Sequence, residues 1–187
     1  MKYRIKDLIE LERKGQHLSF AFFWGPYPKN GKYAPFSQWY ISEFTVDNVK
    51  YVCMEQYMMA MKAMAFNDKA AFDLIMSTTD PKNIKALGRK VRDFNDNTWN
   101  NIVNDIVLKG NIAMFSQNPK LKDLLASTKG MILVEASPYD RRWGIGLDAR
   151  SPKSVHPSEW LGENRLGFIL MEVRDIIPNS VRIGFAY

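Results

Sequence analysis

The 187-residue sequence contains one cysteine and two histidines, and this scarcity excludes several kinds of site. A single cysteine, Cys53, forms no disulfide within the chain and supplies no zinc cluster. Neither His17 nor His156 has a second ligand at the spacing of a metal site. We therefore expect neither a bound metal ion nor another cofactor.

Long apolar segments are missing as well. No stretch approaches the roughly 20 apolar residues that span a membrane. The N-terminal residues 1–7 are largely charged and lack the apolar run of a signal peptide. We expect a cytoplasmic protein that does not bind membranes.

Three common active-site motifs are also absent. The sequence has no Walker-type glycine-rich loop, no Rossmann fingerprint after a strand and no G-x-S-x-G elbow. Any nucleotide chemistry must therefore come from a different arrangement of residues.

The composition is that of a globular protein. A length of 187 residues fits one domain, and no repeat, low-complexity tract or flexible linker marks a boundary within residues 1–187. Aromatic residues reach 13%, which suits a stacking pocket as well as a large core. The formal net charge of +6 favours anionic partners, although solubility alone accounts for it equally well.

The hydrophobic pattern predicts an α+β fold that is mostly helical, with a few short strands. Turn and cap residues punctuate the segments, for example Asp47-Asn48 in a hairpin and Asp80-Pro81 at a helix start. Strands are expected at residues 19–24, 44–46, 49–51, 131–134 and 181–185. Helices are expected at residues 4–14, 54–67, 69–77 and 165–177, and from positions 81, 98 and 119 onward.

The helix at residues 54–67 carries two charged residues on one face. Glu55 and Lys62 are two turns apart, or roughly 10 Å along the axis, and Met, Ala, Tyr and Phe surround them. Burial would lower the pKa of the lysine and raise that of the glutamate, which suits a nucleophilic amine beside an acid or base. The alternative is a half-exposed helix whose charges meet water.

The segment 137–146 is a second candidate site. It combines the acid Asp140 with two arginines, the indole of Trp143 and two glycines. Such a loop can present a carboxylate to a sugar, cations to phosphate and an aromatic face to a base. A structural turn with a surface ion pair is the simpler explanation.

Three further residues have both a structural and a functional interpretation. Trp99 begins a buried helical face, but its ring could also stack on a base. Arg89 belongs to the basic cluster at residues 87–92, which is either a solvated face or a phosphate site. Asn164 stands at a helix start, where capping accounts for it.

Read in order, the motifs of the chain resemble the NADAR (YbiA-like) family over about residues 20–174. The motifs are Phe22-Phe-Trp24-Gly25, Phe36-Ser, Glu55-Gln-Tyr, Lys62-Ala, Gly88-Arg89, Trp99, Phe115-Ser-Gln-Asn-Pro119, Glu135-Ala-Ser-Pro with Asp140, Trp143-Gly, and Asn164-Arg-Leu-Gly167. One position departs from the family pattern: Met114 stands where the family often has lysine. The absence of this lysine removes either a phosphate contact or only a surface charge.

The resemblance implies an enzyme that cleaves an N-glycosidic bond of ribose, with Lys62, Glu55 and Asp140 as catalytic residues. The substrate would be bound by Trp99, Trp143, Arg89, Trp24, Gly25, Phe36 and Asn164. Family members remove ADP-ribose from guanine or cleave ribosylamino intermediates of riboflavin synthesis. The first activity, with ADP-ribosylated nucleic acid as the partner, is our expectation. A phosphorylated ribosylamine as substrate and a non-catalytic ADP-ribose-binding module are the alternatives.

Overall fold

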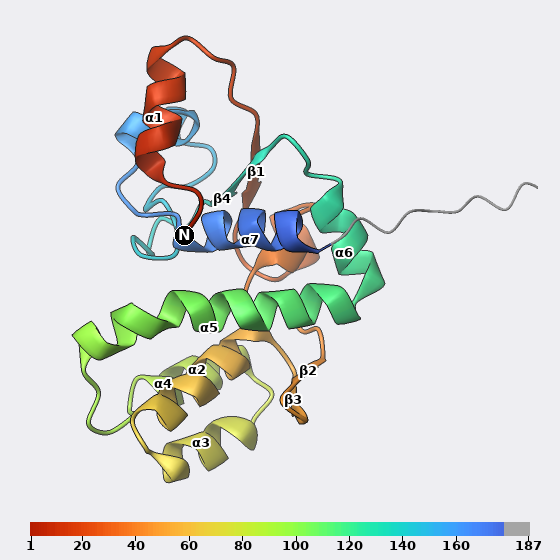
Figure 1. The fold of residues 1–187 in the computed structure, drawn as a ribbon, viewed down its shortest axis with the longest axis vertical. Helices are drawn as coiled ribbons and strands as arrows, with labels where there is room; N and C mark the ends of the chain where they lie inside the picture. Colours follow the sequence, from red (N-terminus) through yellow and green to blue (C-terminus); the bar gives the residue numbers. More distant parts are fainter. Residues whose placement is uncertain (178–187) are drawn as a thin grey trace, which may run out of the picture.

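A computed structural model describes residues 1–177 of the chain (Figure 1). Seven α-helices lie in this range: α1 (Ile5–Arg13), α2 (Met54–Ala65), α3 (Lys69–Met76), α4 (Pro81–Gly88), α5 (Asp96–Gln117), α6 (Pro119–Ala126) and α7 (Arg165–Ile176). Its four strands are β1 (Phe20–Phe23), β2 (Phe44–Val46), β3 (Val49–Tyr51) and β4 (Ile132–Glu135). The α+β class expected from the sequence is confirmed. The strand expected at residues 181–185 lies outside the described residues.

Helices α5 and α7 cross the middle of the molecule and separate two outer groups of elements (Figure 1). On one side, α7 packs against β4, which pairs in parallel with β1. On the other side, α5 packs against α2, and α2 packs against both α3 and α4. The order is therefore sheet, α7, α5, α2 and then the α3–α4 pair.

Local signals in the sequence set the boundaries of most elements. Asp47 and Asn48 both have positive φ, 50° and 65°, as the tight turn between antiparallel β2 and β3 requires. The side chain of Asp80 accepts a hydrogen bond from Lys82 N at the start of α4. Asn95 does the same for Thr98 N, so α5 begins at Asp96, two residues before the expected Thr98.

The core extends from the β1–β4 sheet to α3, and α2 lies within it. Nine of the twelve residues of α2 are buried, including the charged Glu55 and Lys62. The alternative of a half-exposed helix whose charges meet water is therefore wrong. Met114 is also buried, at 1% exposure, and does not line the cleft described below. Within residues 1–177 no helix combines the length and apolar character needed to cross a bilayer.

Candidate active site

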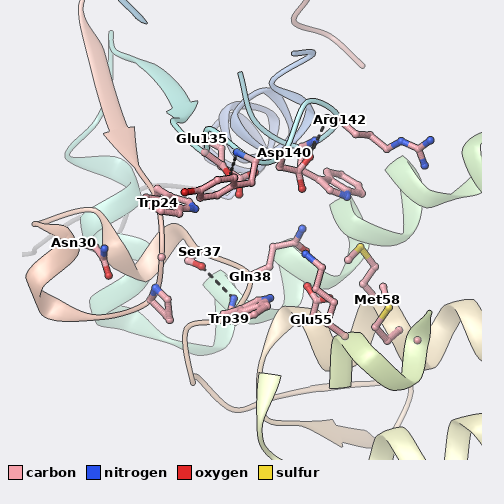
Figure 2. Close-up of a pocket in the computed structure, with 18 of the residues that line it drawn as sticks. Trp24, Asn30, Ser37, Gln38, Trp39, Glu55, Met58, Glu135, Asp140 and Arg142 are labelled. Carbon is pink, nitrogen blue, oxygen red and sulfur yellow. Dashed lines mark hydrogen bonds between the residues drawn. The ribbon is translucent and has the colours of Figure 1, made fainter. Parts of the chain in front are cut away.

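A cleft of about 880 Å³ opens between the outer groups of elements (Figure 2). One wall is formed by α2 and α4, and the opposite wall by the end of β4 and the loop that follows it. The segment after β1, residues 24–30, closes one end. A volume of this size is in the upper part of the range of small-molecule sites, so the cleft is large enough for a dinucleotide-sized ligand.

Glu55 lies on the α2 wall, in the first turn of the helix. Its backbone N donates a 2.9 Å hydrogen bond to Gln38 O, which ties α2 to the segment before it. Burial raises the pKa of Glu55 to about 7, although the positive charge of Lys85 and a hydrogen bond from the Trp39 side chain oppose the rise. A carboxyl group with this pKa can both accept and donate a proton at neutral pH.

Lys62 lies two turns further along α2. Its Nζ donates a 2.9 Å hydrogen bond to Gly88 O, at the end of α4, and lies 3.8 Å from the centre of the Phe94 ring. Burial lowers the pKa of Lys62, and the nearby Arg142 adds to this effect whereas Asp96 opposes it. A larger fraction of the Lys62 amine is therefore in the neutral, nucleophilic form than in an exposed lysine.

Asp140 is held in the opposite wall by its own loop. Its Oδ1 accepts hydrogen bonds from Arg142 N at 2.9 Å and Trp143 N at 2.8 Å. These bonds shape the turn that brings the Trp143 ring into the lining of the cleft. The expected turn is therefore present, and it is part of the site.

Glu135, the last residue of β4, is a third carboxyl group of the cleft. Burial raises its pKa to about 8, the negative charges of Asp140 and Glu55 add to the rise, and Lys85 opposes it. Although part of the residue reaches solvent, its Oε2 is buried and has no hydrogen-bond partner among residues 1–177.

Cations and aromatic rings make up much of the remaining lining. The cations are Lys29, Lys62, Lys85, Arg89, Arg141 and Arg142, against three acids, Glu55, Glu135 and Asp140. The aromatic residues are Trp24, Tyr27, Trp39, Tyr139 and Trp143. Trp24 and Tyr139 are both exposed, and their ring centres are 6.0 Å apart. Flat rings beside an excess of positive charge suit a ligand with both a base and phosphate groups.

The structure brings seven of the ten predicted site residues into this lining: Glu55, Lys62, Asp140, Trp143, Arg89, Trp24 and Gly25. Three others lie elsewhere. Phe36 is 1% exposed and packs on Phe23 and Phe115. Trp99 is 5% exposed in α5, as its place on an apolar helical face indicates.

Asn164 is the third residue outside the lining, and its structural role differs from the expected one. It precedes α7 but its side chain makes no capping bond. Instead, its Oδ1 accepts a hydrogen bond from Glu135 N at 3.0 Å and its Nδ2 donates to Leu133 O at 2.9 Å. Asn164 therefore fixes the end of β4, the strand that carries Glu135.

Several lining residues were not predicted as site residues, among them Gln38, Trp39, Lys85 and Glu135, although Glu135 belongs to one of the family motifs. Signals existed for two of them. Lys85 lies in α4, four residues before its C-cap residue Arg89, a spacing that places both on one helical face. Glu135 is a charged residue at the end of an apolar strand, a position from which side chains often reach into a site.

Comparison with known proteins identifies the family of the chain. The sequence model of the NADAR domain family matches residues 22–178. The chain belongs to the NADAR domain family. The matched residues, 22–178, nearly coincide with the region of about residues 20–174 over which the sequence motifs resemble the family.

Individual relatives extend the comparison. The chain is 41% identical to the N-glycosidase R617 of Acanthamoeba polyphaga mimivirus, over 83% of this chain and 95% of the viral protein. It is 28% identical to the maize chloroplastic riboflavin biosynthesis protein PYRR, over 71% of this chain but 21% of the maize protein. The NMR structure of E. coli YbiA superposes with a TM-score of 0.68 and 25% identity, covering 84% and 83% of the two chains.

Proposed function

We propose that this protein is an N-glycosidase that removes ADP-ribose from guanine bases of nucleic acid. Relatives named N-glycosidase support hydrolysis of an N-glycosyl bond as the general reaction. The observation that carries the proposal is the cleft, which combines three carboxyl groups, one of them the buried Glu55, with a buried amine, aromatic rings and an excess of cations.

The buried amine is the proposed nucleophile. The neutral Lys62 amine attacks the anomeric carbon of the ribose, and the carbon–nitrogen bond to the base breaks with its electron pair going to the nitrogen. The adduct opens to an iminium ion, and water hydrolyses it to free ADP-ribose and the lysine. To reach the sugar, the Lys62 side chain leaves the carbonyl of Gly88, to which its Nζ donates a hydrogen bond.

Glu55 and Asp140 are the proposed acid/base residues that act on the water and the sugar. Glu55 is suited to both directions of transfer because its pKa is about 7. Asp140 has its Oδ1 engaged by the backbone, which fixes the carboxyl group opposite Glu55 (Figure 2). The pair can activate the water and stabilise the positive charge that develops on the sugar.

The rest of the lining accounts for the two ends of the substrate. Lys85 in α4 and Arg89, the C-cap residue of this helix, are one turn apart and suit the pyrophosphate of ADP-ribose. Trp143 and Trp24 offer flat surfaces for the adenine and the guanine.

The test is incubation of the purified protein with guanine-ADP-ribosylated DNA, with ADP-ribose release followed by mass spectrometry. Lys62→Ala is the matched variant. We expect release by the parent protein and none by the variant, with both folded by circular dichroism. Full activity of Lys62→Ala would exclude the lysine as nucleophile.

A small phosphorylated ribosylamine is the second candidate substrate, favoured by the similarity to the maize riboflavin biosynthesis protein. In this substrate, too, the bond that breaks joins a nitrogen to the anomeric carbon of a ribose. Cleavage of the ribosylamine without cleavage of modified DNA would support this candidate. Binding of ADP-ribose with no turnover of either substrate would instead identify a non-catalytic binding module.

A further inference from the structure

We propose that Glu135 is the general acid of this site, the residue that delivers a proton to the nitrogen leaving the ribosyl carbon. The assignment rests on the proposed N-glycosidase function and adds a third carboxyl group to its machinery. Glu55 and Asp140 then act on the sugar and the water. Figure 2 shows Glu135 and Asp140 on one wall of the cleft and Glu55 on the other.

The backbone of Glu135 is fixed from three sides. Its N donates to the buried Asn164 side chain at 3.0 Å, and its carbonyl accepts from Ile145 N at 2.9 Å. The residue also pairs with Phe23 in the parallel β1–β4 register. A side chain on a strand held this firmly reaches the cleft from a defined position, as catalytic groups require.

The carboxyl group itself has no such support. Its Oε2 is buried without a hydrogen-bond partner, and neither oxygen of Glu135 forms an ion pair within residues 1–177. Leaving a buried polar group unpaired costs free energy, so native proteins seldom keep one without use. A substrate atom that bonds to this oxygen would supply the missing partner.

Asp68 provides a contrast within the same protein. It is buried, at 3% exposure, and its carboxylate accepts hydrogen bonds from Ala71 N, Arg92 N and Arg92 Nη2. Those bonds hold its pKa well below the usual range. Asp68 thus has the environment of a structural carboxylate, and Glu135 does not.

The charges around Glu135 favour its protonated form. Asp140 and Glu55 face it with negative charge, and Lys85 is the cation that opposes them. Burial and the two acids together raise the pKa of Glu135 to about 8. At neutral pH the group therefore carries a proton that it can donate.

The proton balance of the reaction is complete with Glu135 as acid. The O–H bond of Glu135 breaks and its proton goes to the leaving nitrogen, which also receives the electron pair of the carbon–nitrogen bond. Glu135 becomes a carboxylate while the Lys62 adduct becomes a cation. Hydrolysis of that adduct by water returns a proton to Glu135 and leaves the lysine neutral.

Glu135→Gln tests the assignment, because glutamine keeps the shape and can donate a hydrogen bond but has no proton to transfer. We expect kcat to fall by about 10²- to 10⁴-fold, the usual contribution of a general acid, with KM changed less than threefold or so. The alkaline limb of the pH profile of kcat/KM should disappear from the residual activity. Glu10→Gln, on the exposed face of α1, is the matched control and should match the parent.

Thermal unfolding separates this role from a structural one. Because the substitution removes a carboxyl group whose ionisation burial disfavours, we expect a Tm equal to or above that of the parent at pH 8. If Glu135→Gln has a lower Tm than the parent, the pH profile of kcat/KM of Glu135→Asp is measured instead. Residual activity with an alkaline limb then supports the assignment, and loss of that limb overturns it.

Both the ADP-ribosylated DNA and the phosphorylated ribosylamine should be assayed, since either substrate needs a proton on its leaving nitrogen. If the parent protein cleaves one of these substrates and Glu135→Gln cleaves it with the same kcat, the assignment is overturned and the proposed function stands. A reduced kcat with the alkaline limb retained overturns it as well. A parent inactive on both substrates overturns the proposed function and the assignment together.

Discussion

At the scale of single residues, burial has opposite consequences for the carboxyl groups of this protein. Asp68 is surrounded by donors, and its pKa falls well below the usual range. Glu55 and Glu135 are not surrounded by donors in this way, and burial raises their pKa to about 7 and about 8. Proteins tolerate such poorly solvated acids mainly at functional sites, because activity there outweighs the loss of stability.

This loss of stability can be measured. A group whose pKa is raised on folding stabilises the fold fully below its unfolded value, near 4.5, and loses this contribution as the pH rises through about 7 for Glu55 and about 8 for Glu135. We therefore expect the Tm of the parent to decline between about pH 5 and about pH 8, and Glu135→Gln to flatten the decline. Thermal unfolding across this range is the measurement, and an unchanged pH slope in the variant would contradict the prediction.

The chemistry of Lys62 makes a second prediction at this scale. An iminium ion between its Nζ and the ribose can be reduced by cyanoborohydride to a stable secondary amine. We expect the parent protein, mixed with substrate and reductant, to gain one ADP-ribose on the tryptic peptide that contains Lys62. Lys62→Arg keeps a long basic side chain but forms no iminium ion, so it should remain unmodified. An adduct on Lys85 instead would move the nucleophile to α4.

At the scale of elements, the sequence predicted most of the helices and strands because their signals are local. The hairpin of β2 and β3 depends on Asp47 and Asn48, and α4 depends on the cap Asp80 and the following proline. The parallel pairing of β1 with β4 could not be predicted in the same way, since Phe20 and Ile132 are joined through more than a hundred intervening residues. Nothing local in either strand specifies the other as its partner.

The contact between α7 and β4 makes a prediction about an element interface. A Cβ added at Gly167 would lie 2.1 Å from Leu133 O and 2.6 Å from the Asn164 amide. Because the first of these is backbone, α7 would have to move away from β4. We expect Gly167→Ala to lower the free energy of unfolding by about 1–3 kcal/mol or more, measured by chemical denaturation.

Loss of activity should accompany this destabilisation, because Asn164 positions Glu135 through its backbone N. Gly15→Ala is the control. Gly15 has φ of 69° but open space around it, so we expect only the backbone penalty of about 1–2 kcal/mol and unchanged activity. Equal effects of the two substitutions on kcat would argue against the link from α7 to the site.

At the scale of the whole molecule, the candidate site is an assembly that the sequence predicted in part. The helical period alone placed Glu55 and Lys62 on one face, and the close spacing of Asp140 and Trp143 kept them together. The family motifs do not distinguish residues that line the cleft from residues that support it. Phe36, Trp99 and Asn164 were therefore predicted to bind substrate, although all three are buried outside the lining. Which side chains reach a cleft depends on packing between distant elements.

The charge of the whole molecule bears on the choice of substrate. The chain has a formal net charge of +6, and three cations of the cleft lining, Lys29, Arg89 and Arg141, belong to exposed residues. A nucleic acid strand that continues beyond the modified guanine can meet such cations with its phosphates. A nucleoside substrate has no strand to do so.

Salt should therefore weaken cleavage of an ADP-ribosylated oligonucleotide more steeply than cleavage of ADP-ribosylguanosine. Each phosphate neutralised by a protein cation contributes about −0.7 to the slope of log affinity against log salt for single strands, so two contacts give about −1.4. Replacing both Lys29 and Arg141 by glutamine should remove about this much from the oligonucleotide slope and leave the nucleoside slope unchanged. Lys120→Gln, on α6 and outside the cleft lining, is the control. Equal slopes for the two substrates in the parent protein would favour a small ribosyl substrate over nucleic acid.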